Sequence, residues 1–212
     1  MVIAPQGPSE DVKAGLTKIR GTLDWIDRKL PDVTIKGDHR HRIPAQLYDL
    51  ALEHAASIFH LIETCRYASA FALVRCEFEC FVRGAWLHHR ATDDEITQFV
   101  EKDEIKPKLW QMIEALEQHP PFEDKLLSNV KESAWTSMNG YTHGGIHQVS
   151  RRLVGDFIEP AFEDGSLLEV IQFTGILSLI SFGEIAAMAN REDLVTEAQA
   201  MIDGGAAQVI HA

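Results

Sequence analysis

Apolar residues recur at steps of three and four along most of the chain, which is the spacing of helices that bury one face. The first such stripe, between residues 9 and 30, ends at Pro31, and the polar segment over residues 32–43 is expected to be a loop. Pro44 suits the first turn of a second amphipathic helix, because the proline ring already has a helical φ angle. Shorter helices are predicted over residues 93–102, 107–118, 122–138 and 191–203. Alternating strand patterns are not found, so the sequence predicts an all-α fold.

Two longer helices carry most of the predicted core. The first, over about residues 64–90, is apolar on nearly every side and is expected to lie at the centre of the bundle. The second, over about residues 166–190, is also apolar, and Gly175 and Gly183 would let a neighbouring helix approach it closely. Because buried charge is costly unless it is paired, the charged residues of the central helix need partners. They are Arg75, Glu77, Glu79 and Arg83.

Length and composition favour one domain. With 212 residues, of which 45% are hydrophobic, the chain can bury about 70% of the surface that its unfolded form exposes. We predict a single-domain bundle of about six to eight helices over residues 9–203. A flexible arm over residues 1–8 and a flexible tail over residues 204–212 are expected to flank it.

The charge and the cysteines restrict the class of function and the compartment. A formal net charge of -12 disfavours a broad face that neutralises nucleic-acid phosphates. Three cysteines in a chain of this size are expected to be free thiols, which favours a reducing cytoplasm. The first residues lack the basic and apolar regions of a signal peptide, and the longest apolar run, over residues 170–182, is too short to span a membrane. We therefore expect a cytoplasmic protein that contacts no membrane.

Arg75, Glu79 and Arg83 are predicted to form a charge ladder on one face of the central helix, because residues four apart lie one above the other. Glu184, on the long C-terminal helix, is the candidate partner from outside. One interpretation is a pocket in which a guanidinium binds an anionic group, and the other is an ion network that only ties helices together. Glu77 points to the opposite face, where its expected partner is Arg66 or an arginine elsewhere in the chain.

A second polar group surrounds two adjacent glycines, Gly144 and Gly145, after which a short helix is expected to restart. His143, Arg151 and Arg152 flank them, and the N–H groups of a helix start attract anions. These residues therefore favour an anion site. The alternative is a plain turn between helices, in which the glycines satisfy the geometry and the arginines reach solvent.

No metal site or cofactor is predicted. His143 and His147 are four residues apart, a spacing that can chelate a metal, but the glutamate of an HExxH motif is absent. Cys76 and Cys80 also lack a second pair of ligands in register. The sequence contains neither a Walker or dinucleotide glycine pattern nor a nucleophile elbow, so nothing in it indicates nucleotide binding or a nucleophilic triad.

Two segments resemble a group of uncharacterised bacterial all-helical proteins. They are LVRCEFECFVRGAWL, over residues 73–87, and MNGYTHGGIHQVSRR, over residues 138–152. In that group a helix with an Arg-Glu-Arg ladder is followed by a turn with tyrosine or phenylalanine and then Thr-His-Gly-Gly, and by an arginine. The resemblance spans most of the chain between about residues 44 and 190. It implies that one site holds Arg75, Glu79, Arg83, His143 and Arg152 together.

The same group is loosely similar to the HEPN superfamily of helical bundles. Ribonucleases of that superfamily, found in toxin and phage-defence systems, carry an arginine, four to six residues and then a histidine. Arg83 and His88 have this spacing, although Gly84 stands where active members usually have a polar residue. Because the two residues lie about 140° apart around a helix, a shared catalytic site would need a second subunit or a break in the helix.

The sequence therefore predicts a bundle, expected to be a homodimer, that binds a small anionic ligand or a partner protein in an internal pocket. One alternative is a metal-independent ribonuclease of the HEPN type that uses Arg83 and His88, and another is an interaction protein whose ion network is purely structural. The predicted ligand-binding residues are Arg75, Glu79, Arg83, His143, Gly144, Gly145 and Arg152.

Overall fold

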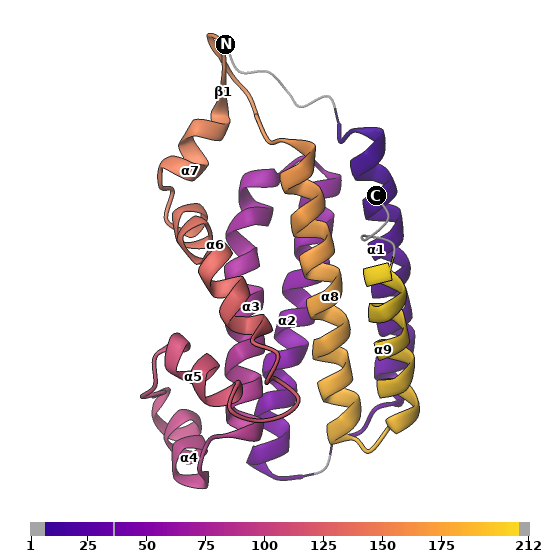
Figure 1. Ribbon diagram of the computed structural model, residues 1–212, viewed down its shortest axis with the longest axis vertical. Coiled ribbons are helices and arrows are strands. Elements are labelled where there is room, and N and C mark those ends of the chain that lie inside the picture. The colour runs from indigo at the N-terminus through magenta and orange to yellow at the C-terminus, as the bar shows by residue number, and fades with distance from the viewer. Residues whose placement is uncertain (1–6, 36, 208–212) are drawn as a thin grey trace.

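The computed structural model describes residues 7–35 and 37–207, apart from the side chains of residues 133–137 and 205–207, and it confirms the all-α class (Figure 1). Within this part of the chain, strand is confined to a hairpin of β1 (Leu153–Val154) and β2 (Phe157–Ile158), which pair antiparallel. The pattern did not predict the hairpin, because two residues are too few to show an alternation. The helices are α1 (Glu10–Lys29), η1 (Leu30–Asp32), α2 (His39–Glu63), α3 (Tyr67–His89), α4 (Asp93–Lys102), α5 (Leu109–Leu116), α6 (Leu126–Thr142), α7 (Ile146–Val149), η2 (Ser150–Arg152), α8 (Asp164–Met188) and α9 (Glu192–Ala207).

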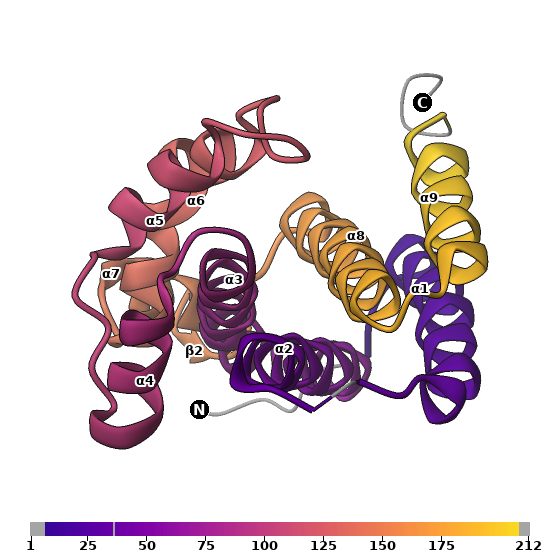
Figure 2. The ribbon, with the colours of Figure 1, turned by 90° about the horizontal axis from the view of Figure 1, so that it is seen from below.

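Helix α3 lies at the centre of the bundle, as predicted. It packs against α2, α5, α6 and α8, while α1 and α9 lie on the far side of α8 (Figure 2). Two apolar clusters share α3: one gathers around its N-terminal half with the start of α1 and the end of α2, and the other around its C-terminal half with α5, α8 and α9. The central helix therefore connects the whole core.

Two helix starts, those capped by Ser9 and Thr92, were predicted correctly. The Ser9 side chain accepts a hydrogen bond from the N–H of Val12 at 3.2 Å, and α1 begins at the next residue. Thr92 and Glu95 form the predicted capping box at the start of α4. In each case the short polar side chain satisfies backbone N–H groups that lack an intrahelical partner.

The predicted loop over residues 32–43 is wrong in its second half, since α2 begins at His39. Asp38 caps this helix by accepting a hydrogen bond from the N–H of His41 at 3.1 Å. Pro44 consequently lies inside α2, buried, and does not occupy its first turn. The helix starts at the Asp38 cap, and not at Pro44, because the Asp38 side chain bonds a backbone N–H group of the first turn.

Two predicted ends at glycine are also wrong. Helix α6 continues through Asn139 and Gly140, and a side chain at Gly140 would meet the ring of His147 at 2.9 Å. Glycine here serves close packing and does not end the helix. Helix α9 continues past residue 203, where the predicted bundle ended, through two glycines to Ala207. Residues 1–6 and 208–212 of the predicted arm and tail lie outside the described residues.

Helix α8 is a core helix, as predicted. By length and composition it is the one helix in the described part of the chain that could cross a bilayer, but half of its apolar stretch is buried inside the bundle. A side chain at Gly175 would meet Ile19 of α1 at 3.3 Å, so this glycine does bring two helices close together. Gly183 has no such neighbour. The cytoplasmic location stays a prediction.

Glu77 is fully buried at the contact between α3 and α8. Its Oε2 accepts a hydrogen bond from the hydroxyl of Thr174 at 3.0 Å, whereas its Oε1 is buried with no hydrogen-bond partner. The hydrogen-bond partner of Glu77 is therefore a threonine, and the predicted arginine partner is wrong. Burial raises the pKa of Glu77 well above its usual range, although the Thr174 hydrogen bond opposes this effect. Burial therefore favours the neutral acid over the carboxylate at this position.

The substitution Glu77→Gln tests this protonation state. A carboxyl group whose pKa is higher in the folded than in the unfolded chain keeps an extra proton on folding, so the wild type loses stability as the pH rises above about 4.5. We expect Glu77→Gln to be more stable than the wild type at pH 8, by about 1–3 kcal/mol, and equal to it near pH 4.5. Cys80, whose pKa burial raises to about 11, stays neutral over this range. Urea unfolding of the variant and the wild type at both pH values is the measurement. If the two proteins differ in free energy of unfolding by the same amount at pH 4.5 and pH 8, Glu77 is ionised in the fold.

Candidate functional site

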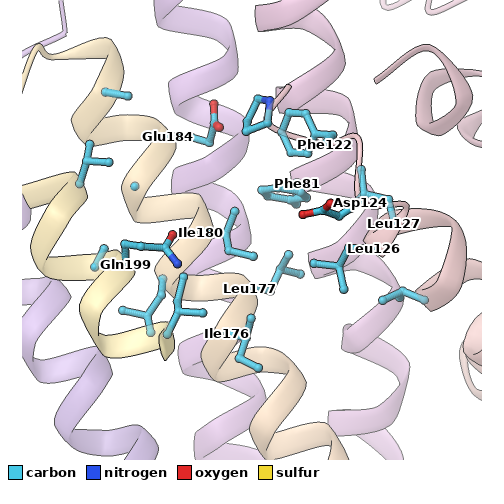
Figure 3. A pocket seen from close by; sticks show the side chains of 18 of the residues that line it. Phe81, Phe122, Asp124, Leu126, Leu127, Ile176, Leu177, Ile180, Glu184 and Gln199 are labelled. Carbon is cyan, nitrogen blue, oxygen red and sulfur yellow. The ribbon is translucent and has the colours of Figure 1, made fainter. Parts of the chain in front are cut away.

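A cleft of about 650 Å³ opens between α3, α8 and α9 on one side and α6 with its preceding loop on the other. Its walls are mainly apolar, and its polar residues are few (Figure 3). Figure 3 shows Glu184 at one end of the cleft and Ile176 at the other. A volume of this size, mainly apolar walls and a few convergent polar groups are the usual properties of a small-molecule site.

Glu184 closes the polar end of the cleft together with two histidines. His88 and His89 form the last turn of α3, and Glu184 lies in the last turns of α8. The Glu184 Oε2 atom lies 2.8 Å from Nε2 of His89 and 3.5 Å from Nδ1 of His88. The hydroxyl of Tyr48, from α2, donates a hydrogen bond to the same oxygen at 3.2 Å. Helices α2 and α3 thus place three polar groups around one carboxylate oxygen of α8.

This carboxylate is ionised even though its side chain is only 12% exposed. Burial alone would raise the pKa of Glu184, but its contacts with His88 and His89 outweigh burial and lower the pKa to about 2. Burial and the negative charge of Glu184 raise the pKa of Tyr48 well above its usual range, so the phenol keeps the proton that it donates. The polar end of the cleft consequently holds an ionised carboxylate at neutral pH.

Two glycines shape this end of the cleft. A side chain at Gly84 would meet the ring of Tyr48 at 3.1 to 3.3 Å, so the glycine gives Tyr48 the room to reach Glu184. Tyr48 is fully buried and packs on Phe81 with ring centroids 5.7 Å apart, which leaves it little freedom to shift. Gly183, next to Glu184, lines the cleft and faces open space. Small residues therefore position the tyrosine and widen the cleft.

The predicted charge ladder is present, and the structure brings His143 to it. Arg75 Nε donates to Glu79 Oε1 at 2.6 Å, and Arg83 Nη2 donates to Glu79 Oε2 at 3.2 Å. Nη1 of Arg75 lies 3.3 Å from Nε2 of His143, at the end of α6. The predicted partner Glu184 is wrong, since it binds the histidines at the end of α3. Neither the arginines nor the glutamate of the ladder line the cleft described above or a smaller cavity of about 320 Å³.

The two glycines after His143 make a turn between α6 and α7. Gly144 has a φ of +64°, and the N–H of Gly145 donates to the carbonyl of Gly140 at 2.8 Å. That N–H group is therefore already bonded within the turn, as the alternative interpretation of this segment required. Arg152 is exposed in η2, and no bond joins it to the ladder among the described contacts.

Arg151, rather than its neighbour, points into the bundle. Its guanidinium lies over the rings of three aromatic residues at 5.2 to 5.4 Å, and one of its nitrogens, Nη1, is buried without a hydrogen-bond partner. Cation–π contacts of this kind hold an arginine in place at modest energy. The aromatic residues are Phe71, Tyr141 and Phe162.

Comparison with known families gives a match over residues 48–206, to a family of unknown function, DUF6988. The chain belongs to the DUF6988 family. The matched range contains the ladder, the turn after α6 and the whole polar end of the cleft. A comparison with curated proteins finds no match, and a comparison with solved structures finds none either. Membership in DUF6988 is consistent with an uncharacterised helical domain and assigns no activity to it.

The structure places the two residues of the HEPN-type spacing against different neighbours. Arg83 bonds to Glu79 on the ladder face of α3, whereas His88 faces Glu184 at the end of the cleft. This agrees with the angular separation expected from the helix. A ribonuclease function for this DUF6988 protein stays a prediction.

Sequence reasoning missed the group of Tyr48, His89 and Glu184 as a site. One signal for it is present in the sequence, because Glu184 is the single charged residue between Glu169 and Arg191, in an otherwise apolar helix. A lone charge in such a helix needs a buried partner. Two adjacent histidines at the end of the other apolar helix offered one.

Replacing Gly84 tests how the tyrosine is positioned. Gly84→Ala is expected to destabilise the DUF6988 fold by about 1–3 kcal/mol, because the added methyl group overpacks against Tyr48, and this outweighs the roughly 1 kcal/mol that alanine gains in a helix. Gly21→Ala is the matched control, since Gly21 is exposed in α1 with open space around it, and should stabilise the protein. Thermal unfolding measures both. A stabilising Gly84→Ala would contradict the tight packing of Tyr48.

Replacing the ladder with apolar side chains tests whether it holds the fold together. Arg83 is 45% exposed and Glu79 20% exposed, and partly exposed ion pairs contribute little. We expect Arg75→Met/Glu79→Leu/Arg83→Met to change the free energy of unfolding by less than about 1 kcal/mol. Chemical denaturation is the measurement. A loss of about 3 kcal/mol or more would show that the ladder is a structural network.

Proposed function

We propose that this protein binds a small molecule that has an apolar body and a cationic or hydrogen-bond-donating end, in the cleft between α3, α6, α8 and α9. The observation that carries the proposal is an apolar cleft that ends at the carboxylate of Glu184, whose side chain is 12% exposed. Apolar walls of this extent favour an apolar ligand, because each buried square ångström contributes about 25 cal/mol. The carboxylate of Glu184 fixes the orientation by attracting the polar end of the ligand.

The charge at the polar end of the cleft determines whether a cationic or an anionic ligand group is preferred there. Glu184 is negative at neutral pH, since its contacts with His88 and His89 hold its pKa at about 2. A cation in a poorly solvated site is attracted more strongly than in water, because the effective dielectric constant is lower. An anionic end would be repelled by the same charge. The predicted binding of a small anionic ligand at the ladder is a separate proposal, and there each arginine already bonds to Glu79.

We also propose that the protein forms the predicted homodimer. Six large apolar side chains between α7 and β2 are each at least 41% exposed, which favours a partner surface on this part of the molecule. It lies apart from the cleft, so the two proposals are independent. The residues are Ile146, Val149, Leu153, Val154, Phe157 and Ile158.

Two probes with the same alkyl chain test the cleft. Decylamine is cationic at neutral pH and decanoate is anionic. Each is added to protein that has been treated with a chelator and loaded with the dye Nile red, and the loss of dye fluorescence measures its binding. We expect decylamine to bind at least about tenfold more tightly than decanoate, a difference of about 1.4 kcal/mol.

Two variants separate the walls of the cleft from its polar end. Ile176→Trp, which fills the end of the cleft away from Glu184, should weaken the binding of both probes by about tenfold or more. Glu184→Gln should abolish the preference for the amine.

Ile146→Trp is the matched control, since Ile146 is 72% exposed on α7 and does not line the cleft. It should leave both affinities unchanged. Tighter binding of decanoate, or equal binding by the wild type and Ile176→Trp, would contradict the proposal. A decanoate affinity that is lost in Arg83→Ala would instead favour the anion site at the ladder.

The ribonuclease alternative is separated by a different assay. If the wild type cleaves RNA and both Arg83→Ala and His88→Ala do not, catalysis replaces binding as the function. We expect no cleavage by the wild type, because the net charge of -12 disfavours RNA and the two side chains face different neighbours.

A further inference from the structure

His88, His89 and Glu184 bring three metal-ligating atoms together at the polar end of the cleft. Nδ1 of His88, Nε2 of His89 and a carboxylate oxygen of Glu184 lie within 4.8 Å of one another. Ligands that surround a tetrahedral zinc ion at about 2.1 Å are about 3.4 Å apart. The His88–Glu184 separation of 3.5 Å already fits this value, and the His89–Glu184 separation of 2.8 Å would open by about half an ångström.

The Nδ1 atom of His88 is the observation that points to a missing ligand. It is buried, faces Glu184, and makes no hydrogen bond. A buried polar atom without a partner costs about 1–3 kcal/mol, so native proteins seldom keep one. A metal ion between the three side chains would satisfy this nitrogen and would also replace the proton that His89 shares with Glu184.

The surroundings of the three side chains have the features of a metal site. Tyr48 donates to Glu184, and such outer hydrogen bonds orient metal-binding carboxylates. The ring of Phe122, from the loop before α6, packs edge-on against His89 with centroids 5.4 Å apart. All three donor residues line the cleft, so a fourth coordination position would face into it.

We propose that His88, His89 and Glu184 bind one divalent transition-metal ion of the zinc class. Two imidazoles and one carboxylate are a donor set that zinc, cobalt and iron(II) accept, whereas magnesium and calcium prefer oxygen donors alone. The ion leaves one or two positions open to the cleft. This inference deepens the proposed function, because the ion becomes the polar end of the cleft and reverses its charge preference: the metal-loaded protein selects ligands with an anionic or metal-coordinating end.

Titration of chelator-treated protein with Co²⁺ tests the site without any organic ligand. We expect one equivalent to bind, with the strong visible absorption of a tetrahedral or five-coordinate cobalt ion, and Zn²⁺ to displace it. His88→Ala, His89→Asn and Glu184→Gln should each weaken Co²⁺ binding by at least about 100-fold, and Tyr48→Phe by about tenfold, because it removes only the outer hydrogen bond. Circular dichroism confirms that each variant is folded.

Two controls isolate the site. His60→Ala removes an exposed histidine of α2 and should leave cobalt binding unchanged. Ile176→Trp should bind Co²⁺ as the wild type does while losing decylamine, so a failure of the metal site and a failure of the cleft are distinguishable. In the Nile red assay, one equivalent of Zn²⁺ should make decanoate the tighter probe.

Two results would overturn the inference. One is an absence of stoichiometric Co²⁺ or Zn²⁺ binding by the folded wild type. The other is binding that survives both His89→Asn and Glu184→Gln, which would place the ion at other histidines of the chain. If decylamine still binds in either case, the cleft remains a ligand site and only the metal is lost.

Discussion

The burial of α3 is the constraint on which the rest of the structure depends. This helix is enclosed by α2, α5, α6 and α8, so each polar side chain that it carries must find a partner on a neighbouring helix or in the helix itself. It meets this requirement in three ways. The ladder pairs its charges along α3 and reaches His143, Glu77 accepts a hydrogen bond from Thr174, and the terminal histidines contact Glu184.

Two of these three contacts join α3 to α8, and together they fix how the two helices lie against each other. Thr174 and Glu184 are ten residues apart on α8, and their partners Glu77 and His89 are twelve residues apart on α3. With α8 held in this position, its apolar face turns toward α6 and α9, which do not close over it. The part of the apolar face of α8 that α6 and α9 leave uncovered forms the wall of the cleft. At the polar end of the cleft the pairing of buried polar groups is incomplete at Nδ1 of His88, as it is at Oε1 of Glu77 deeper in the contact.

Local features of the fold could be predicted from the sequence, and contacts between distant helices could not. The apolar periodicity located α3 and α8, the caps at Ser9 and Thr92 fixed two helix starts, and the ladder followed from spacing within one helix. The start of α2 was misplaced because Pro44 is also tolerated one turn inside a helix that Asp38 caps.

The candidate site depended on information that periodicity does not contain. His89 and Glu184 are separated by 95 residues, and whether they meet depends on the register of α8 against α3. That register follows from the burial of Glu77 against Thr174 of α8, whereas Gly84 beneath Tyr48 brings α2 close to α3. The turn after α6 was located correctly, but only the structure shows that its N–H group is bonded and that Arg151 points inward.

The most direct test of the cleft as the binding site is a map of amide chemical shifts as decylamine is added to uniformly ¹⁵N-labelled protein. The changes are predicted to centre on α8 and α9 around Gly183, and on the last turn of α3. Changes centred instead on Arg75, Glu79 and His143, with Gly183 unaffected, would contradict the cleft and place the ligand at the charge ladder.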